Sequence, residues 1–280
     1  MEKLVQFAPK ASFYDGPFGG DSGWISAGMG YLIVTENGRL IAIDGGNTED
    51  AADFCELITK YSPDGEVDLW LLTHPHTDHF GALSGIAGNE ELASRIKVKK
   101  LVSLFGTEAD MPSDETEAAR RAIALEAHDA ILARLGYRAT EPSEGDTYTV
   151  DSAKLRIIAL PKDLSRANAS SIIFSVSTNG KKVLFTGDCT TDRLEDAFDR
   201  YKSELKSDVL QIPHHGLCDT GYIPFYEAVS PKIIFVPICR SGEESMKSGI
   251  YGDATEPQLY VESIVSAIHR AYEGTVEIEL

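Results

Sequence analysis

Short apolar runs bounded by turn residues alternate with amphipathic stretches along the first half of this chain. Two of the runs, 31–34 and 40–43, flank Asn37-Gly38, a dipeptide that favours a tight hairpin turn. The spacing of apolar positions then predicts a helix over 48–61, strands over 67–72 and 98–105, and a helix over 113–135. Ser113 is the expected N-cap of the last helix, and Gly136 follows its end. Residues 1–27 are glycine-rich and irregular, and could supply a first strand or a loop near a site.

The second half repeats this alternation. Apolar runs predict strands over 148–150, 155–160, 172–176 and 183–185, then 209–212 and 233–236. Asn179-Gly180 indicates a second hairpin. The remaining stretches predict a helix over 191–205, a polar loop over 240–256, a helix near 259–272 and a final strand over 275–280.

The two halves correspond in order. An Asn-Gly turn, a strand, a glycine-containing turn, a helix and a strand ending near a histidine occur twice, at an offset of about 140 residues. We therefore expect one domain, 1–280, built from two pseudo-equivalent halves, about 1–145 and 146–280. Each half would form a sheet covered by helices on its outer face, and the sheets would pack face to face.

Composition narrows the classes of function. The chain has 280 residues, 42% of them hydrophobic, and a net charge of −18. No basic stripe is evident, which argues against strong non-specific binding of nucleic acid. We find no signal-peptide pattern and no apolar run that would suggest a membrane span. The scattered cysteines, Cys55, Cys189, Cys218 and Cys239, are typical of reduced thiols, so we expect a cytoplasmic protein.

The segment 73–79 carries the clearest chemistry. His74, His76, Asp78 and His79 lie within six residues, directly after the apolar run 69–72. His74 and His76 can point the same way in an extended turn, whereas Asp78 and His79 begin the next element. Imidazole nitrogens with carboxylate oxygens suit zinc, and also manganese or iron. The segment therefore predicts a metal site.

This His-x-His-x-Asp-His pattern resembles the signature of the metallo-β-lactamase superfamily. The resemblance extends to Asp44-Gly45-Gly46, Thr186-Gly187-Asp188 and His214-His215-Gly216, each of which follows an expected strand. It implies an α/β fold, a four-layer αββα sandwich, with a site for one or two metal ions where the sheets meet. Members are mostly hydrolases.

The resemblance also implies roles for single residues. His74 and His76 would bind a first divalent ion, and Asp78 and His79 a second, with Asp188 between them. Asp44 would orient a ligand histidine. We expect two ions, zinc before manganese or iron.

The choice between the adjacent histidines rests on the internal correspondence of the halves. It superposes His214 on His74, so His214 is the expected ligand. His215 would then lie behind the metal ligands or face the substrate, where it could donate a proton to a leaving group. Asp78 and His215 are thus the catalytic candidates.

Other motifs bear on the substrate. The stretch 166–171 lacks the further histidine of glyoxalase-II-like and lactamase-like members. With Asn168 and Ser171, this stretch and the His-His-Gly motif resemble the hydrolase domain of the DNA-uptake protein ComEC and a phosphorylcholine esterase, which implies phosphodiester chemistry. The chain departs from that branch at Leu217, where serine is usual, and at Asp253, where histidine is usual. The predicted activity is hydrolysis of a small or short phosphate ester. The alternatives are a thioester or lactone hydrolase and a catalytically degenerate metal-binding module.

Overall fold

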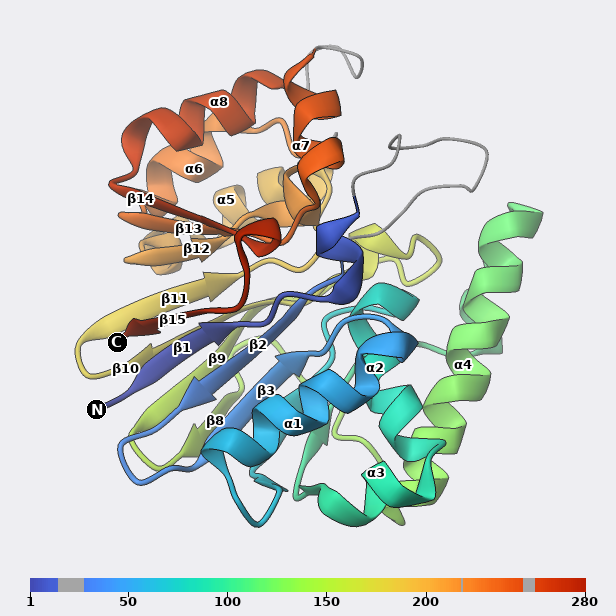
Figure 1. Ribbon diagram of the computed structural model, residues 1–280. Coiled ribbons are helices and arrows are strands. Elements are labelled where there is room, and N and C mark those ends of the chain that lie inside the picture. Colours follow the sequence, from blue (N-terminus) through green and yellow to red (C-terminus); the bar gives the residue numbers. More distant parts are fainter. Residues whose placement is uncertain (15–27, 218, 249–254) are drawn as a thin grey trace.

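Two β-sheets pack face to face with helices on both outer faces, as Figure 1 shows. The computed structural model describes residues 1–14, 28–217, 219–248 and 255–280. Within these residues the first sheet has the order β15 (Val276–Glu279), β1 (Lys3–Gln6), β2 (Gly30–Val34), β3 (Leu40–Asp44), β5 (Leu69–Leu71), β7 (Leu101–Val102). The second has the order β14 (Ala267–Arg270), β13 (Ile233–Val236), β12 (Val209–Gln211), β11 (Lys181–Phe185), β10 (Ile173–Thr178), β9 (Ala153–Ala159), β8 (Thr147–Val150).

The helices form the two outer layers (Figure 1). On the side of the first sheet lie α1 (Ala51–Tyr61), α2 (Thr77–Ala87), α3 (Glu90–Arg95) and α4 (Glu115–Leu135). On the side of the second sheet lie α5 (Thr191–Leu205), α6 (Ile223–Val229), α7 (Arg240–Lys247) and α8 (Thr255–Ile264). The first half also contains a two-stranded sheet of β4 (Glu66–Val67) and β6 (Lys97–Val98). This is the predicted αββα sandwich.

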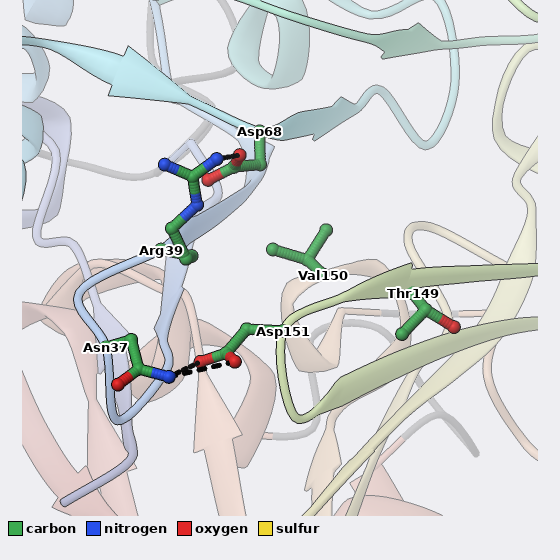
Figure 2. A pocket seen from close by; sticks show the side chains of 6 residues that line it. All are labelled: Asn37, Arg39, Asp68, Thr149, Val150 and Asp151. Atoms are coloured by element: carbon green, nitrogen blue, oxygen red, sulfur yellow. Dashed lines mark hydrogen bonds and ion pairs between the residues drawn. The ribbon is translucent and has the colours of Figure 1, made fainter.

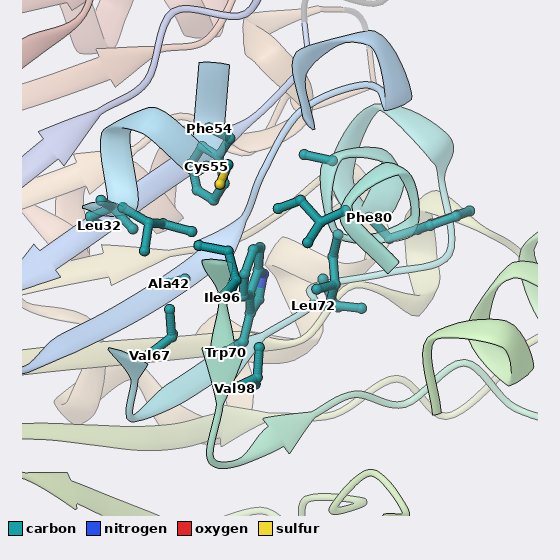
Figure 3. Packing of buried hydrophobic residues seen from close by; sticks show 14 of the residues in the cluster. Leu32, Ala42, Phe54, Cys55, Val67, Trp70, Leu72, Phe80, Ile96 and Val98 are labelled. Atoms are coloured by element: carbon teal, nitrogen blue, oxygen red, sulfur yellow. The ribbon is translucent and has the colours of Figure 1, made fainter. Parts of the chain in front are cut away.

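Continuous apolar runs form the central strands because both faces of each sheet are buried. In β5, Leu69 and Leu71 face the other sheet, whereas Trp70 packs with the helices outside. Figure 3 shows Trp70 among Phe54 of α1 and Phe80 of α2. Three apolar layers result, one between the sheets and one under each set of helices.

Both predicted hairpins are present. β2 pairs antiparallel with β3, and β10 with β11, around Asn37-Gly38 and Asn179-Gly180. Strands β3, β5 and β7 are parallel, as are β11, β12, β13 and β14. Parallel strands bring their carboxyl ends to one edge, so the turns after β3, β5, β11 and β12 gather there.

Several elements differ from the sequence predictions. The predicted polar loop contains α7, and the helix predicted to reach residue 272 ends at Ile264, before β14. The N-cap of α4 is Asp114 rather than Ser113, because the Asp114 side chain accepts hydrogen bonds from the Thr116 and Glu117 amides. The strand predicted over 98–105 is reduced to β6 and β7. Residues 15–27 of the irregular segment 1–27 lie outside the described residues, but β1 provides a first strand.

The last strand crosses between the halves. β15 pairs antiparallel with β1, so the sheet of the first half is completed by the end of the second. Leu280 lies in the apolar layer between the sheets, and its amide donates to the Glu2 carbonyl. A boundary near residue 145 therefore does not separate the two sheets.

The end of the sandwich away from the histidine segment contains a hollow lined mostly by polar residues. Figure 2 shows a hollow lined by Asn37, Arg39, Asp68, Thr149, Val150 and Asp151. Asn37 donates to Asp151, and Arg39 pairs with Asp68. Arg39 and Asp68 precede β3 and β5, whereas the histidine segment follows β5. One hydrogen bond and one ion pair therefore hold this hollow at the end of the strands away from the histidines.

Candidate metal centre

One buried group of four donors comes from three turns at the carboxyl edge. Asp78 and His79 begin α2, Asp188 follows β11, and His215 follows β12. The His79 Nε2 lies 3.5 Å from Asp78 Oδ2 and 3.3 Å from Asp188 Oδ1. His215 Nε2 lies 3.1 Å from Asp78 Oδ2 and 3.5 Å from Asp188 Oδ2. Two imidazole nitrogens and two carboxylates thus converge at one point, and the group fits a divalent metal ion.

A second group shares Asp188. It consists of His74, His76 and Asp188. His74 is fully buried, and its Nε2 lies 3.5 Å from Asp188 Oδ2. The Nε2 atoms of His74 and His76 and Oδ1 of Asp188 are buried without a hydrogen-bond partner in the described part of the chain. Such atoms are costly to bury unless something binds them, so these donors fit a metal ion.

Burial and the neighbouring charges shift the histidine pKa values in opposite directions in the two donor groups. Burial, with the nearby His79, holds the pKa of His74 well below its usual value, and burial also lowers the pKa of His76. Although burial works against it, the carboxylates of Asp188 and Asp78 raise the pKa of His79 well above its usual value. They raise the pKa of His215 to about 10, also against burial. The paired imidazoles hold the pKa values of Asp78 and Asp188 well below the usual range, again against burial.

Asp44 lies directly behind His79. Its Oδ2 accepts a 2.7 Å hydrogen bond from His79 Nδ1, and its carbonyl accepts one of 2.8 Å from the Trp70 indole. Asp44 has a positive φ of 51°, a backbone conformation that is uncommon outside glycine but more frequent for Asp than for most residues. These contacts fix the ring so that its Nε2 faces the cluster.

The turn that carries Asp188 is held from both sides. Ser171 Oγ accepts a 2.9 Å hydrogen bond from the Asp188 amide. Gln211 Oε1 accepts hydrogen bonds of 2.8 and 2.9 Å from the Thr186 and Gly187 amides. A Cβ on Gly187 would lie 2.9 Å from Ser171 Oγ, so only glycine fits this turn without a shift. The Asp188 carboxylate is therefore rigidly placed.

The structure directs the adjacent histidines differently from the internal correspondence. His214 and His215 both have positive φ, 47° and 55°, and this left-handed turn rotates His215 rather than His214 towards the carboxylates. The Pro237 carbonyl accepts a 2.7 Å hydrogen bond from His215 Nδ1, which leaves its Nε2 for the cluster. His214 Nε2 instead lies 3.1 Å from Asn168 Nδ2. The internal correspondence assumed the same extended turn as in 74–76, whereas the backbone at His214 and His215 is left-handed.

The remaining predicted site residues lie in different surroundings. Ser171 supports the Asp188 turn, Asn168 contacts His214, and Asp253 lies outside the described residues. Sequence reasoning overlooked Gln211 and Pro237 as supports. It also overlooked Thr73, whose hydroxyl donates a 2.7 Å hydrogen bond to Asp44 Oδ2. Gln211 had a signal, because it is a polar residue within a buried apolar strand. Of the cysteines in the described part, Cys55, Cys189 and Cys239 are free and buried.

The sequence matches a family model. The model describes the metallo-beta-lactamase superfamily, and it matches residues 26–220. This range contains every member of both donor groups. The chain belongs to the metallo-β-lactamase superfamily. A comparison with curated protein sequences gave no match.

Solved structures share the fold at low sequence identity. The metallo-beta-lactamase fold protein YhfI from Bacillus subtilis is 10% identical, with a TM-score of 0.56 and 100% of both chains covered. Zn²⁺-bound PqqB from Methylobacterium extorquens is 10% identical, with a TM-score of 0.55 and 100% of both chains covered. A diphosphatase of the PhnP family is 11% identical, with a TM-score of 0.51 and 100% of this chain and 98% of that chain covered.

In the described residues, no helix is long and apolar enough to cross a membrane.

Proposed function

We propose that the protein is a metal-dependent hydrolase that cleaves a phosphodiester or related phosphate ester at a pair of divalent ions. The observation that carries the proposal is the pair of donor groups that share Asp188 and are buried except for the partly exposed His76. Zinc suits their nitrogen and oxygen donors best, with manganese and iron as rivals. The names of related folds leave the metal open, since PqqB is Zn²⁺-bound and CmlA is called a diiron beta-hydroxylase.

The residues of the chain would hold and orient the reacting groups. When bound, divalent ions supply Lewis acidity to phosphoryl oxygens and lower the pKa of a water towards about 7. Asp188 keeps the two donor groups at a fixed separation, because its turn is anchored by Ser171 and Gln211. Such fixed dipoles and charges need not reorganise when charge develops on the substrate.

The proposed catalytic roles change because His215, rather than His214, faces the carboxylates. We assign His215 to the metal, with Asp78, His79 and Asp188, in place of a role as proton donor. Asp78 remains a catalytic candidate, because its carboxylate lies within the same cluster and can accept a proton from a water. Asn168 and His214 are proposed substrate contacts, since Asn168 Oδ1 is buried without a hydrogen-bond partner among the described residues.

Three features support a phosphate ester as substrate. The stretch 166–171 lacks the histidine of thioesterase-like members. The motifs at 168–171 and 214–216 resemble those of the ComEC-type hydrolase domain. Two ions also suit an in-line phosphoryl displacement. The net charge of −18 favours a small or short substrate over a long nucleic acid.

A substrate panel tests the proposal. Protein loaded separately with zinc, manganese and iron is assayed on bis(p-nitrophenyl) phosphate, p-nitrophenyl phosphate, a thioester, a lactone and a β-lactam. We expect the phosphodiester to be hydrolysed fastest, and Asp188→Ala to abolish that activity. Hydrolysis of the thioester or lactone alone would overturn the substrate class. Metal binding without any turnover would favour a degenerate binding module.

A further inference from the structure

Thr73 is a fully buried residue that contacts both donor groups from behind. Its Oγ1 lies 2.7 Å from Asp44 Oδ2, 3.1 Å from His74 Nδ1 and 3.3 Å from His79 Nδ1. His74 belongs to one donor group and His79 to the other. One hydroxyl therefore lies between the Nδ1 atoms of two histidines that belong to different donor groups.

The hydrogen positions follow from what each group can donate. A carboxylate only accepts, so the Thr73 hydroxyl donates its single hydrogen to Asp44 Oδ2. For the same reason, His79 Nδ1 donates to Asp44 Oδ2. The Thr73 oxygen then has only lone pairs left for His74, so His74 Nδ1 must carry the hydrogen of the 3.1 Å contact.

From these contacts we infer that Thr73 is a positioning residue that sets the tautomer of His74, whereas Asp44 sets that of His79. With its hydrogen on Nδ1, His74 presents the Nε2 lone pair to the group with His76 and Asp188. Without the hydroxyl, His74 can also place its hydrogen on Nε2 and block that position. The inference rests on the proposed metal centre. In it, Thr73 supports the donor group of His74 and Asp44 supports that of His79.

The surroundings leave Thr73 no freedom to turn away. Its amide donates a 2.7 Å hydrogen bond to Asp44 Oδ1, and its carbonyl accepts one of 3.1 Å from the Ile172 amide. A Cβ on Gly187 would lie 3.0 Å from Thr73 Cβ, so the side chain is packed against the turn that carries Asp188. The hydroxyl is held at one point between the groups.

The test separates the two positions with variants that keep the shape of the site. Thr73→Val removes only the hydroxyl, and Thr73→Ser keeps it. Asp44→Asn removes the carboxylate at a backbone conformation that Asn tolerates. Zinc and cobalt titrations measure each site's affinity, and long-range ¹H–¹⁵N spectra report which ring nitrogen of each histidine carries a hydrogen.

We expect Thr73→Val to weaken one of two metal positions by about 10- to 100-fold, with His74 changing tautomer and His79 unchanged. Thr73→Ser should restore wild-type affinity, and Asp44→Asn should change the tautomer of His79. Wild-type affinity at both positions in Thr73→Val, or no restoration by Ser, would overturn the inference. If Thr73→Val does not fold, the wild-type spectrum decides, since His74 protonated on Nε2 in metal-free protein contradicts it. None of these outcomes measures hydrolysis, so failure here leaves the proposed activity to its own test.

Discussion

At the scale of single residues, the centre depends on which ring atoms the backbone turns inward. The left-handed turn at 214–216 directs His215, held by Pro237, to Asp78 and Asp188. His214 contacts Asn168 instead. The motif in the sequence located both histidines at the correct strand end. It could not choose between them, because one residue of backbone rotation exchanges their directions.

The two histidines should therefore differ in metal binding. We expect His215→Ala to lower metal affinity by at least about 10-fold, since it removes a direct donor of the four-residue group. His214→Ala is the matched control, and it should keep the wild-type metal content while lowering turnover. Equilibrium dialysis with elemental analysis measures both variants. Loss of metal from His214→Ala with retention in His215→Ala would restore the assignment made from the sequence.

The pH dependence of the metal-free protein follows from the same residues. The folded pKa of His215, about 10, and that of His79 are raised above the unfolded value near 6.5. Their contribution to stability is therefore fully present below about pH 6.5 and is lost as the pH rises through the folded pKa. For Asp78 and Asp188 the pKa is lowered, so their contribution is present above about pH 4 and is lost in acid.

We thus expect the free energy of unfolding of metal-free protein to fall between pH 7 and pH 10, as measured by urea denaturation with a chelator present. His215→Gln should make this part of the profile flatter. A metal-free protein that becomes more stable over the same interval would contradict the assigned charges.

At the scale of elements, α2 brings Asp78 and His79 to the centre because it packs closely on the turn after β3. A Cβ on Gly81 would lie 2.6 Å from the Thr48 amide nitrogen and 2.7 Å from the Asn47 carbonyl carbon. The sequence predicted the strand before the motif but not α2. Its first turn contains the donor residues Asp78 and His79, and two internal glycines weaken the helical pattern.

Substituting Gly81 tests this packing. Gly81→Ala should lower the free energy of unfolding by about 1–3 kcal/mol, because backbone atoms would have to move. It should also weaken metal binding, since the displaced helix carries Asp78 and His79. Gly88→Ala is the control at the exposed end of α2, where the nearest atom would be 3.4 Å away. Equal effects of the two substitutions in urea denaturation would exclude close packing as the cause.

At the scale of the whole molecule, the sandwich is continuous across the predicted halves. The αββα layers, both hairpins and the strand-end positions of the donors could be predicted, since they follow from local apolar patterns and short motifs. The crossing of β15 into the first sheet could not, because pairing with β1 joins residues 270 to 276 positions apart. The strand order of a sheet is not encoded in any local pattern.

This crossing should make the two sheets unfold together. Leu280→Ala is expected to cost about 2–3 kcal/mol, because the side chain is only 4% exposed between the sheets. Ile264→Ala is the control, since Ile264 is 42% exposed. Calorimetry of metal-free protein should show one transition that shifts as a whole. Two transitions, of which Leu280→Ala moves only one, would show that the halves are independent.

The central claim is that Asp188 joins two metal positions, one with His74 and His76 and the other with Asp78, His79 and His215. Anomalous diffraction from crystals grown with zinc tests it most directly. We predict two peaks on either side of the Asp188 carboxylate, each about 2.0–2.1 Å from its histidine nitrogens, with His214 coordinating neither. An absence of peaks at Asp188, or a peak coordinated by His214, would contradict the account.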